Sequence, residues 1–263
     1  MADQDSFPSY FNGDKTPDEQ EGTRKRTARG ISTSNLIMSA HVGGNAEVFP
    51  LILDLYVPQG SRIADVTYGK GVFWRNVDES EYDLLKSDAQ MGIDARDLPY
   101  PDDYLDALVL DPPYMEGFYR RKKDHQGAKG THQAFSEYYS HLQAQEPKAG
   151  YPKYHDAVLD VYYRAGEEAD RVLKDKGVFI VKCQDEVSAN SQRLTHVEII
   201  NYYQSLGFIP EDIFVVVRTN KPSVSRLLKQ THARKNHSYF VIMRKDHRKA
   251  LKQIENMRRV WRK

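Results

Sequence analysis

The stretch DALVLDPPYM, residues 106–115, is the part of the sequence that indicates the fold most directly. Its apolar run, Ala107 to Leu110, has the continuous hydrophobic character of a strand that is buried on both faces of a parallel sheet. The run ends in the tetrapeptide Asp111-Pro112-Pro113-Tyr114. Because open α/β sheets bind ligands at the carboxyl ends of their strands, this tetrapeptide is a candidate site.

The side chains of the tetrapeptide are suited to holding a planar amine. A carboxylate such as that of Asp111 accepts hydrogen bonds from an amino group. Pro112 and Pro113 have a fixed φ and no N–H, so the carbonyl groups around them point stiffly in one direction. Tyr114 offers a flat face on which a base can stack. A tight turn after a buried strand explains the tetrapeptide alone equally well.

The rest of the chain alternates between helices and strands. The strands are continuous apolar runs, which predicts a mostly parallel, doubly wound sheet in an α/β domain. The last two strands have no helix between them, which predicts an antiparallel pair at one edge. The predicted helices cover residues 45–57, 155–174 and 195–206, a short helix begins at residue 72, and the predicted strands cover residues 62–65, 82–86, 107–110, 178–182, 213–218 and 238–243.

The composition is that of a soluble globular enzyme, with 263 residues of which 40% are hydrophobic and 29% charged. No apolar run has the length of a membrane span and no leader opens the chain, so we expect no membrane association. The single cysteine, Cys183, excludes an internal disulfide and a multi-cysteine zinc site, and favours a cytoplasmic location. We expect Cys183 to be a small core residue rather than a nucleophile.

Three parts are predicted along the chain. Residues 1–30 are polar and aperiodic, which is typical of a disordered or loosely attached arm. Residues 31–245 form the domain, with a basic and aromatic loop inserted at 115–152. Residues 246–263 form a basic helix.

The positive charge is concentrated toward the carboxyl end. From Thr219 onward there are fourteen lysines and arginines against two acids, although the net charge of the whole chain is only +1. A basic segment in a protein of nearly zero net charge indicates a face that binds nucleic acid, and residues 221–237 are the candidates for it. Residues 249–263 are more typical of a solvated helix. The candidate nucleic-acid contacts are Arg120, Arg121, Lys122, Arg226, Lys229, Arg234, Lys235 and His237, with Asn236 oriented toward the base pocket.

A second motif, DVTYGKGVF at residues 65–73, follows the first strand of the predicted sheet. Gly69 and Gly71 let a ligand approach the backbone closely. The motif lacks the spacing of a Walker phosphate loop and the third glycine of the dinucleotide fingerprint. Two glycines alone are weak evidence for a ligand site. Asp65 and Thr67 before them and the tetrapeptide downstream strengthen that assignment.

In this order the motifs resemble the S-adenosylmethionine-dependent amino-methyltransferases of nucleic acids, whose DPPY-type members methylate N6 of adenine. The resemblance implies a single class I methyltransferase-like domain and extends over residues 31–115, more loosely to residue 243. It implies S-adenosylmethionine as cofactor, with no metal. The implied cofactor residues are Asp65, Thr67, Gly69, Gly71 and Phe73 around the methionine part, Asp88 at the ribose, Asp94 at the adenine, and His41, Asn45 and Phe49 in the preceding segment HVGGNAEVFPLIL.

The same resemblance implies a catalytic role for Asp111, Pro112, Pro113 and Tyr114, acting on a base flipped out of the duplex. An acid in the first position of the tetrapeptide favours adenine over cytosine. Asp88 and Asp94 are so close in sequence that the helix usually found between their strands must be missing or reduced. We expect Asp111 to be a surface acid whose replacement leaves the fold intact.

Four functions remain open at this point, and the oligomeric state is open in all of them. A solitary or phage-type DNA adenine methyltransferase is favoured, and an RNA adenine methyltransferase would have the same core. A protein-glutamine methyltransferase usually begins its tetrapeptide with asparagine and needs no basic carboxyl third. A catalytically silent nucleic-acid-binding subunit would need neither Asp65, Gly69 and Gly71 nor the tetrapeptide at 111–114, all of which are intact.

Overall fold

The structure is a computed structural model that describes residues 36–114, 152, 154–219 and 229–261. The chain divides into two units, and all the described helices and strands belong to the second, Ile37–Lys263. None of the helices in these ranges is long and apolar enough to cross a membrane. The predicted arm, the predicted basic loop apart from Pro152, and the candidates Arg120, Arg121, Lys122 and Arg226 lie outside the described residues.

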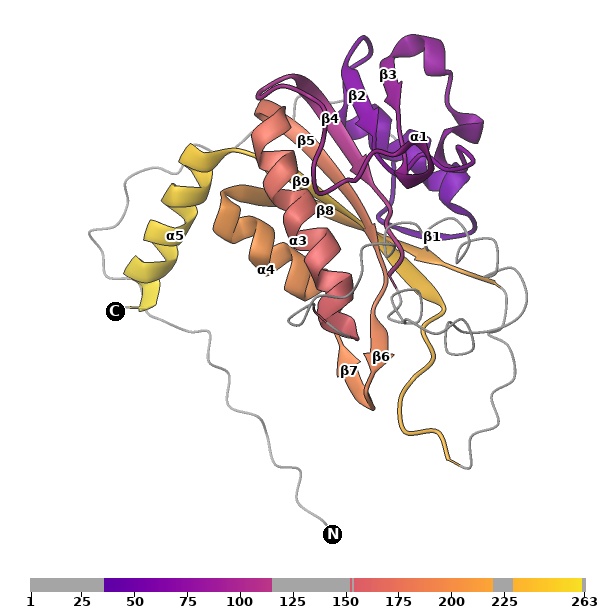
Figure 1. Ribbon diagram of the computed structural model, residues 1–263. Helices are drawn as coiled ribbons and strands as arrows, with labels where there is room; N and C mark the ends of the chain where they lie inside the picture. The colour runs from indigo at the N-terminus through magenta and orange to yellow at the C-terminus, as the bar shows by residue number, and fades with distance from the viewer. Residues whose placement is uncertain (1–35, 115–151, 153, 220–228, 262–263) are drawn as a thin grey trace. The chain divides into compact units, whose positions relative to one another are not determined.

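In the described ranges, seven strands form one mixed sheet in the order β1-β8-β9-β5-β4-β2-β3 (Figure 1). All neighbours are parallel except β9, which runs antiparallel to both β5 and β8. The mostly parallel sheet and the antiparallel pair β8–β9 are therefore confirmed, but the pair does not lie at the edge as predicted, because β1 lies outside it. The strands are β1 (Ala40–Val42), β2 (Arg62–Asp65), β3 (Asp83–Lys86), β4 (Leu105–Leu110), β5 (Leu173–Cys183), β8 (Phe208–Val217) and β9 (His237–Lys245).

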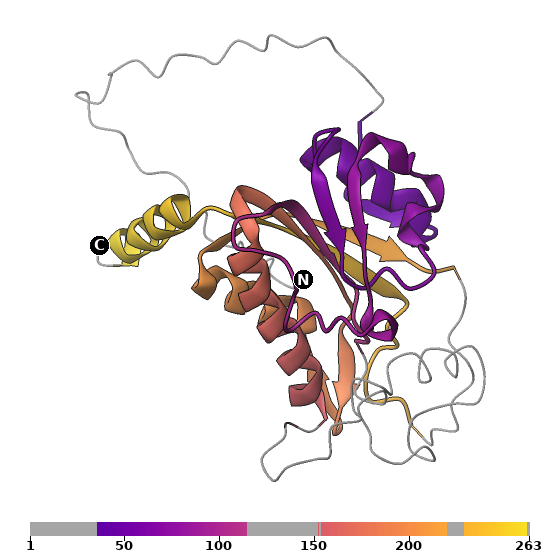
Figure 2. The same cartoon turned by 45° about the horizontal axis from the view of Figure 1, so that its top comes forward.

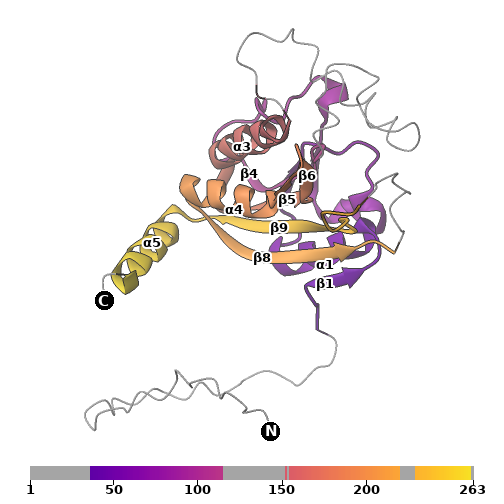
Figure 3. The same ribbon diagram turned by 90° about the horizontal axis from the view of Figure 1, so that it is seen from below.

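Helices cover both faces of the sheet (Figure 3). Helix α1 (Asn45–Tyr56) packs on one face, and α3 (His155–Val172) and α4 (Thr195–Leu206) pack on the other. Helix α4 ends at Gly207, whose φ of 104° is the left-handed conformation that glycine adopts at low cost. Helix α5 (His247–Trp261) follows β9, and the short 3₁₀ helices are η1 (Phe73–Asn76), η2 (Glu79–Glu81) and η3 (Ala89–Met91).

Strand β4 shows how the alternation of side chains builds two cores. Leu108 and Leu110 face the core beneath α3 and α4. Ala107 and Val109 face the other core, which is beneath α1. Since side chains two residues apart share a face, this register directs the side chain of Asp111 toward the α1 side of the sheet.

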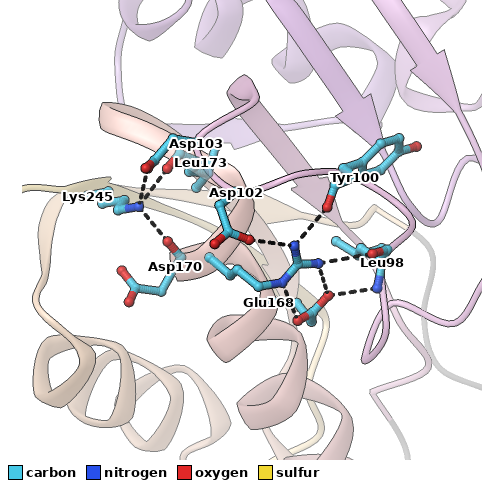
Figure 4. A network of polar contacts seen from close by, with 9 residues as sticks. Leu98, Tyr100, Asp102, Asp103, Glu168, Asp170, Leu173 and Lys245 are labelled. Atoms are coloured by element: carbon cyan, nitrogen blue, oxygen red, sulfur yellow. Dashed lines mark hydrogen bonds and ion pairs between the residues drawn. The ribbon is translucent and has the colours of Figure 1, made fainter.

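A network of ion pairs and hydrogen bonds fixes the segment that leads into β4 (Figure 4). The guanidinium of Arg171, in α3, donates to the carbonyls of Leu98 and Tyr100 at 3.0 and 2.7 Å. The same guanidinium pairs with Glu168, whose carboxylate accepts from the backbone N–H of Leu98 at 2.7 Å. Lys245 bonds to the Asp103 carboxylate and to the Leu173 carbonyl. Charged groups at the amino end of β4 thus set the path that ends at Asp111.

The sequence did not predict β1 or the separate hairpin of β6 (Glu186–Ser188) and β7 (Ser191–Arg193). The hairpin turns at Ala189 and Asn190, whose φ angles of 48° and 61° are those of a two-residue turn with both central residues left-handed. Such a turn is usually marked by glycine, which is absent here. Figure 1 shows the hairpin projecting beyond the end of α3, and Figure 2 shows it beside that end.

Candidate active site

Three acids lie at the carboxyl ends of three neighbouring parallel strands. Asp65 is the last residue of β2, Asp88 lies two residues beyond β3, and Asp111 immediately follows β4. Asp65 is in register with Lys86 of β3 and Val109 of β4. The sheet order β4-β2-β3 therefore brings these predicted site residues to one edge, where open α/β sheets bind their ligands.

Thr67 joins the glycine turn to the tetrapeptide. Its hydroxyl oxygen accepts a hydrogen bond from the backbone N–H of Asp111 at 2.7 Å. Its own backbone N–H and hydroxyl donate to Oδ1 of Asp65 at 3.0 and 3.3 Å. The two motifs, although far apart in sequence, are therefore one hydrogen-bonded structure.

The carboxylate of Asp65 organises the turn. It is 2% exposed, and its Oδ2 accepts from the indole Nε1 of Trp74 at 2.8 Å. Burial raises the pKa of Asp65 to about 6, against the opposing effect of the bonds from Trp74 and Thr67. Trp74 was not among the predicted residues, although an indole N–H nine residues after an acid is a donor that a buried carboxylate needs.

Both glycines of the turn have left-handed φ angles, 52° at Gly69 and 62° at Gly71. A Cβ at Gly71 would lie 2.6 Å from the hydroxyl of Tyr68, so the ring of Tyr68 can occupy its place only beside a glycine. That hydroxyl donates to Glu79 at 3.0 Å. A Cβ at Gly69 would have only the carbonyl of Thr67, at 3.8 Å, within reach, which leaves the backbone there open to a ligand.

Asp88 and Asp94 have different surroundings. Oδ1 of Asp88 accepts from the backbone N–H groups of Gln90 and Met91 and caps η3. The reduced helix expected between the two acids is confirmed, since only the three residues of η3 lie there. Asp94 binds the guanidinium of Arg96, which reaches Asp160 of α3. Burial alone would raise the pKa of Asp94, but its bonds with Arg96 lower it below the usual value.

The remaining predicted cofactor residues lie around β1, α1 and η1. Phe73 is 6% exposed, and its ring centroid is 5.2 Å from that of Phe49 and 5.1 Å from that of Phe240. Phe73 and Phe49 are thus core residues beneath the turn. His41, in β1, stacks on Phe214 and bonds to the carbonyl of Met38, and Asn45 begins α1. Cofactor contacts by these residues stay predictions.

Asp111 is not the surface acid that we expected. Its Oδ1 is buried and has no hydrogen-bond partner among the described residues. Burial raises the pKa of Asp111, Lys182 and Arg218 lower it, and the neighbouring Asp65 raises it further. Asp111 as a whole is half-buried rather than exposed, and the hydroxyl of Thr67 holds its backbone N–H. An unpaired buried acceptor is costly to desolvate, so its retention points to function.

Lys182 lies beside Asp111 and was not predicted. Leu110 of β4 is in register with Val181 of β5, so the next residue of each strand, Asp111 and Lys182, lie opposite each other. Lys182 is 1% exposed, and its Nζ lies 4.0 Å from the ring centroid of Phe240. Burial lowers the pKa of Lys182, and Asp111 opposes that shift. The signal for it in the sequence is a lysine inside the apolar run VFIVKC, residues 178–183.

The segment Asp111–Tyr114 forms a corner at the end of β4, which its two prolines and its tyrosine complete. Pro112 and Pro113 are buried, and Tyr114 is half-buried. The hydroxyl of Tyr114 accepts a hydrogen bond from Nη2 of Arg218 at 2.7 Å, and the backbone N–H of Arg218 donates to the carbonyl of Asn236. Arg218 thereby connects the tetrapeptide to the basic segment before β9.

The described nucleic-acid candidates form this segment. Lys229, Arg234 and Asn236 are exposed, whereas Lys235 is half-buried. His237 is half-buried, and its Nε2 bonds to the hydroxyl of Tyr239 at 2.8 Å.

Cys183, the last residue of β5, is buried, and burial raises the pKa of its thiol. Its predicted role as a core residue is confirmed. Within the described ranges there is no group of three or more His, Cys, Asp or Glu side chains placed to hold a metal ion.

Solved structures with a similar fold include methyltransferases. A putative DNA modification methylase from Thermus thermophilus in complex with S-adenosyl-L-methionine is 15% identical over 70% of this chain and 56% of its own, with a TM-score of 0.36. TrmN from Thermus thermophilus is 13% identical over 77% of this chain and 50% of its own, with a TM-score of 0.41. The chain spans about half the length of the first such structures. A search of curated proteins found no match.

The family model described as DNA methylase matches residues 105–262, more than half of the chain. The match includes the tetrapeptide and all of the carboxyl half, and begins after the glycine turn. It confirms the resemblance to S-adenosylmethionine-dependent amino-methyltransferases and supports S-adenosylmethionine as the cofactor. The chain belongs to the DNA methylase family.

Proposed function

We propose that this protein transfers the methyl group of S-adenosylmethionine to the N6 amine of adenine in DNA, with the base flipped into the Asp111–Tyr114 corner. The observation that supports this most is the buried Oδ1 of Asp111, which has no hydrogen-bond partner among the described residues. It lies at the end of β4, tied through Thr67 to a glycine turn. An acceptor in that position needs a donor, and the amino group of a base is one.

The choice of adenine rests on the acid in the first position of the tetrapeptide, since the resemblance goes with adenine for Asp and cytosine for Ser. The family description, DNA methylase, supports DNA. The basic segment with Arg234 and Lys235 at the same edge supports a polyanionic substrate. Methylation of cytosine at N4 or of adenine in RNA would use the same corner. A single buried cysteine fits a cytoplasmic location.

S-adenosylmethionine supplies an electrophilic methyl group on a sulfonium. The open backbone at Gly69 and the carboxylates of Asp65 and Asp88 are the groups that would bind it. Asp88 suits a hydroxyl-bearing sugar because its Oδ2 has no hydrogen bond among the described residues. The buried acids also suit a positively charged ligand, which would offset the repulsion between Asp65 and Asp111.

The chain's own residues orient the amine. Asp111 accepts a hydrogen bond from it, the Pro112 carbonyl accepts a second, and Tyr114 stacks on the ring. Two acceptors favour a more tetrahedral nitrogen whose lone pair points away from the ring, and Asp111 is placed to take the proton that nitrogen loses. Orientation of this kind accounts for several kcal/mol of the barrier.

The test is to incubate the protein with S-adenosylmethionine carrying a labelled methyl group and either DNA or RNA, digest the product to nucleosides, and identify the labelled one by mass. We expect N6-methyldeoxyadenosine from DNA. Label on cytosine N4 or in RNA would change the proposed substrate but would leave the proposed methyl-transfer site in place. No labelled nucleoside from either polymer, with the cofactor bound, would contradict the proposal.

A further inference from the structure

Two buried polar atoms from opposing strand positions lack hydrogen bonds. Among the described residues, Oδ1 of Asp111 and Nζ of Lys182 are both buried and without a hydrogen-bond partner. An ammonium inside a protein is costly unless it is paired and hydrogen-bonded. Two such atoms at the ends of neighbouring strands therefore mark a place where a ligand with complementary polar groups would be bound.

The strand register places both side chains over the same patch of the sheet. Leu110 pairs with Val181, so Asp111 and Lys182 are opposite each other at the ends of β4 and β5. On the other side, Lys182 is in register with Phe240 of β9. Nζ of Lys182 lies 4.0 Å from the centroid of the Phe240 ring. This cation–π contact stabilises the charge of the ammonium but does not replace a hydrogen-bond acceptor for its N–H groups.

A carboxylate acceptor beside an ammonium donor matches one edge of a base. Adenine presents its N6 amine as a donor next to N1, an acceptor, and cytosine presents N4 next to N3 in the same way. Guanine and thymine place a carbonyl where the amine would be and an N–H donor at the neighbouring ring nitrogen. A keto base would thus face Asp111 with an oxygen and Lys182 with a hydrogen, leaving both buried groups unsatisfied.

We propose that Lys182 donates a hydrogen bond to the ring nitrogen adjacent to the target amine while Asp111 accepts from the amine itself. Lys182 thereby selects bases that have an amino group beside an unprotonated ring nitrogen, and it fixes the rotation of the base in the pocket. The inference rests on the proposed methyl transfer and extends it to a residue that determines substrate specificity. A site that hydrogen-bonds a substrate group strongly rejects an analogue that lacks it.

The test compares two duplexes that contain a methylation site, which is mapped beforehand by locating the labelled methyl groups on DNA fragments of known sequence. One carries adenine at the target position and the other 1-deazaadenine, in which the ring nitrogen is replaced by C–H and the amine is kept. With the wild-type protein we expect kcat/KM to fall about 10- to 100-fold on the deaza substrate, the range for one hydrogen bond to a charged group. Lys182→Met should lose about the same factor on adenine and nothing further on 1-deazaadenine.

Lys174→Met is the matched control, because Lys174 lies at the opposite end of the same strand, is 46% exposed and pairs with Asp106. It should discriminate between the two duplexes as the wild type does. The unfolding temperature of Lys182→Met is measured alongside, because the change leaves the Asp111 carboxylate without its positive neighbour.

Equal rates of the wild type on both duplexes would overturn the inference. So would a further loss of rate when Lys182→Met acts on the 1-deazaadenine duplex, because the two changes should remove the same hydrogen bond. The wild-type comparison decides the matter even if that variant does not fold. Failure of the proposed function is distinguishable, because the unmodified adenine duplex would then not be methylated at all.

Discussion

At the scale of single residues, the site consists of charged groups in surroundings that disfavour charge. Asp65 and Lys182 are buried, and Asp111 is half-buried with its Oδ1 enclosed. Of the two acids, only Asp65 has hydrogen bonds to its carboxylate among the described residues. Asp111 was recognised from its place in a motif. Lys182 was not: its place in the apolar run of residues 178–183 indicates burial, whereas its position opposite Asp111 depends on the register of β5 with β4.

The pH dependence of kcat/KM should report the raised pKa of Asp111. Transfer requires the carboxylate form, and burial shifts its loss to a higher pH than the usual range near 4. Lys182→Met removes the positive neighbour that lowers this pKa, so the acid limb of the profile should move to still higher pH. Lys174→Met should leave the limb unchanged. An acid limb at lower pH in Lys182→Met would contradict this electrostatic account.

Among the elements of the fold, the glycine turn and the tetrapeptide hold each other in place through the hydrogen bonds of Thr67. The sequence predicted β2 and α4 to the residue, and α1 and α3 within two residues, because long apolar periodicities and a terminal glycine define such elements. It missed β1 and the β6–β7 hairpin, whose three-residue strands are too short to show a period. It also missed Trp74 and Arg218, which are defined by tertiary contacts.

Gly71→Ala should disrupt the cofactor turn. The new Cβ would lie 2.6 Å from the Tyr68 hydroxyl at a φ of 62°, so both the ring and the backbone would have to move. We expect the Kd for S-adenosylmethionine, measured by calorimetry, to rise at least about tenfold, the equivalent of about 1.4 kcal/mol.

Gly60→Ala is the control for backbone strain alone, since Gly60 has a φ of 80° with nothing within 4 Å of the new Cβ. It should cost about 1 kcal/mol of folding stability, as expected for a left-handed non-glycine residue, and leave cofactor affinity unchanged. Equal affinities in the two variants would show that the turn does not bind the cofactor.

At the scale of the whole molecule, a sheet edge with three acids adjoins a basic segment that ends at β9. Arg218 joins the two through Tyr114 and Asn236. This arrangement brings the surface that we propose for phosphates next to the segment, Asp111–Tyr114, that we propose for the amine. The fold class and the order of motifs could be predicted from sequence, because each motif follows a strand end. The closeness of the basic segment to the tetrapeptide could not, because it depends on β9 inserting between β5 and β8.

Replacing Arg234 and Lys235 together by alanine should weaken DNA binding and flatten its salt dependence. The slope of log K against log salt should decrease by about 0.9 for each phosphate that the variant no longer neutralises, up to about 1.8 for the pair. Binding is measured by titration at several salt concentrations. The double variant Lys249→Ala/Lys252→Ala on α5 should keep the wild-type slope, because both side chains lie on an exposed terminal helix. A larger decrease in slope from the α5 variant than from Arg234→Ala/Lys235→Ala would show that DNA binds at α5 rather than at the basic segment before β9.

Asp111→Asn separates an action of Asp111 on the amine of the base from a role in cofactor binding. Both the single-turnover rate of methyl transfer and the affinity for S-adenosylmethionine are measured in this variant. We expect a rate at least about 100-fold below that of the wild type, with cofactor affinity and unfolding temperature retained, since asparagine removes a charge and little volume. A wild-type rate, or a rate that falls only in proportion to weaker cofactor binding, would contradict an action on the amine.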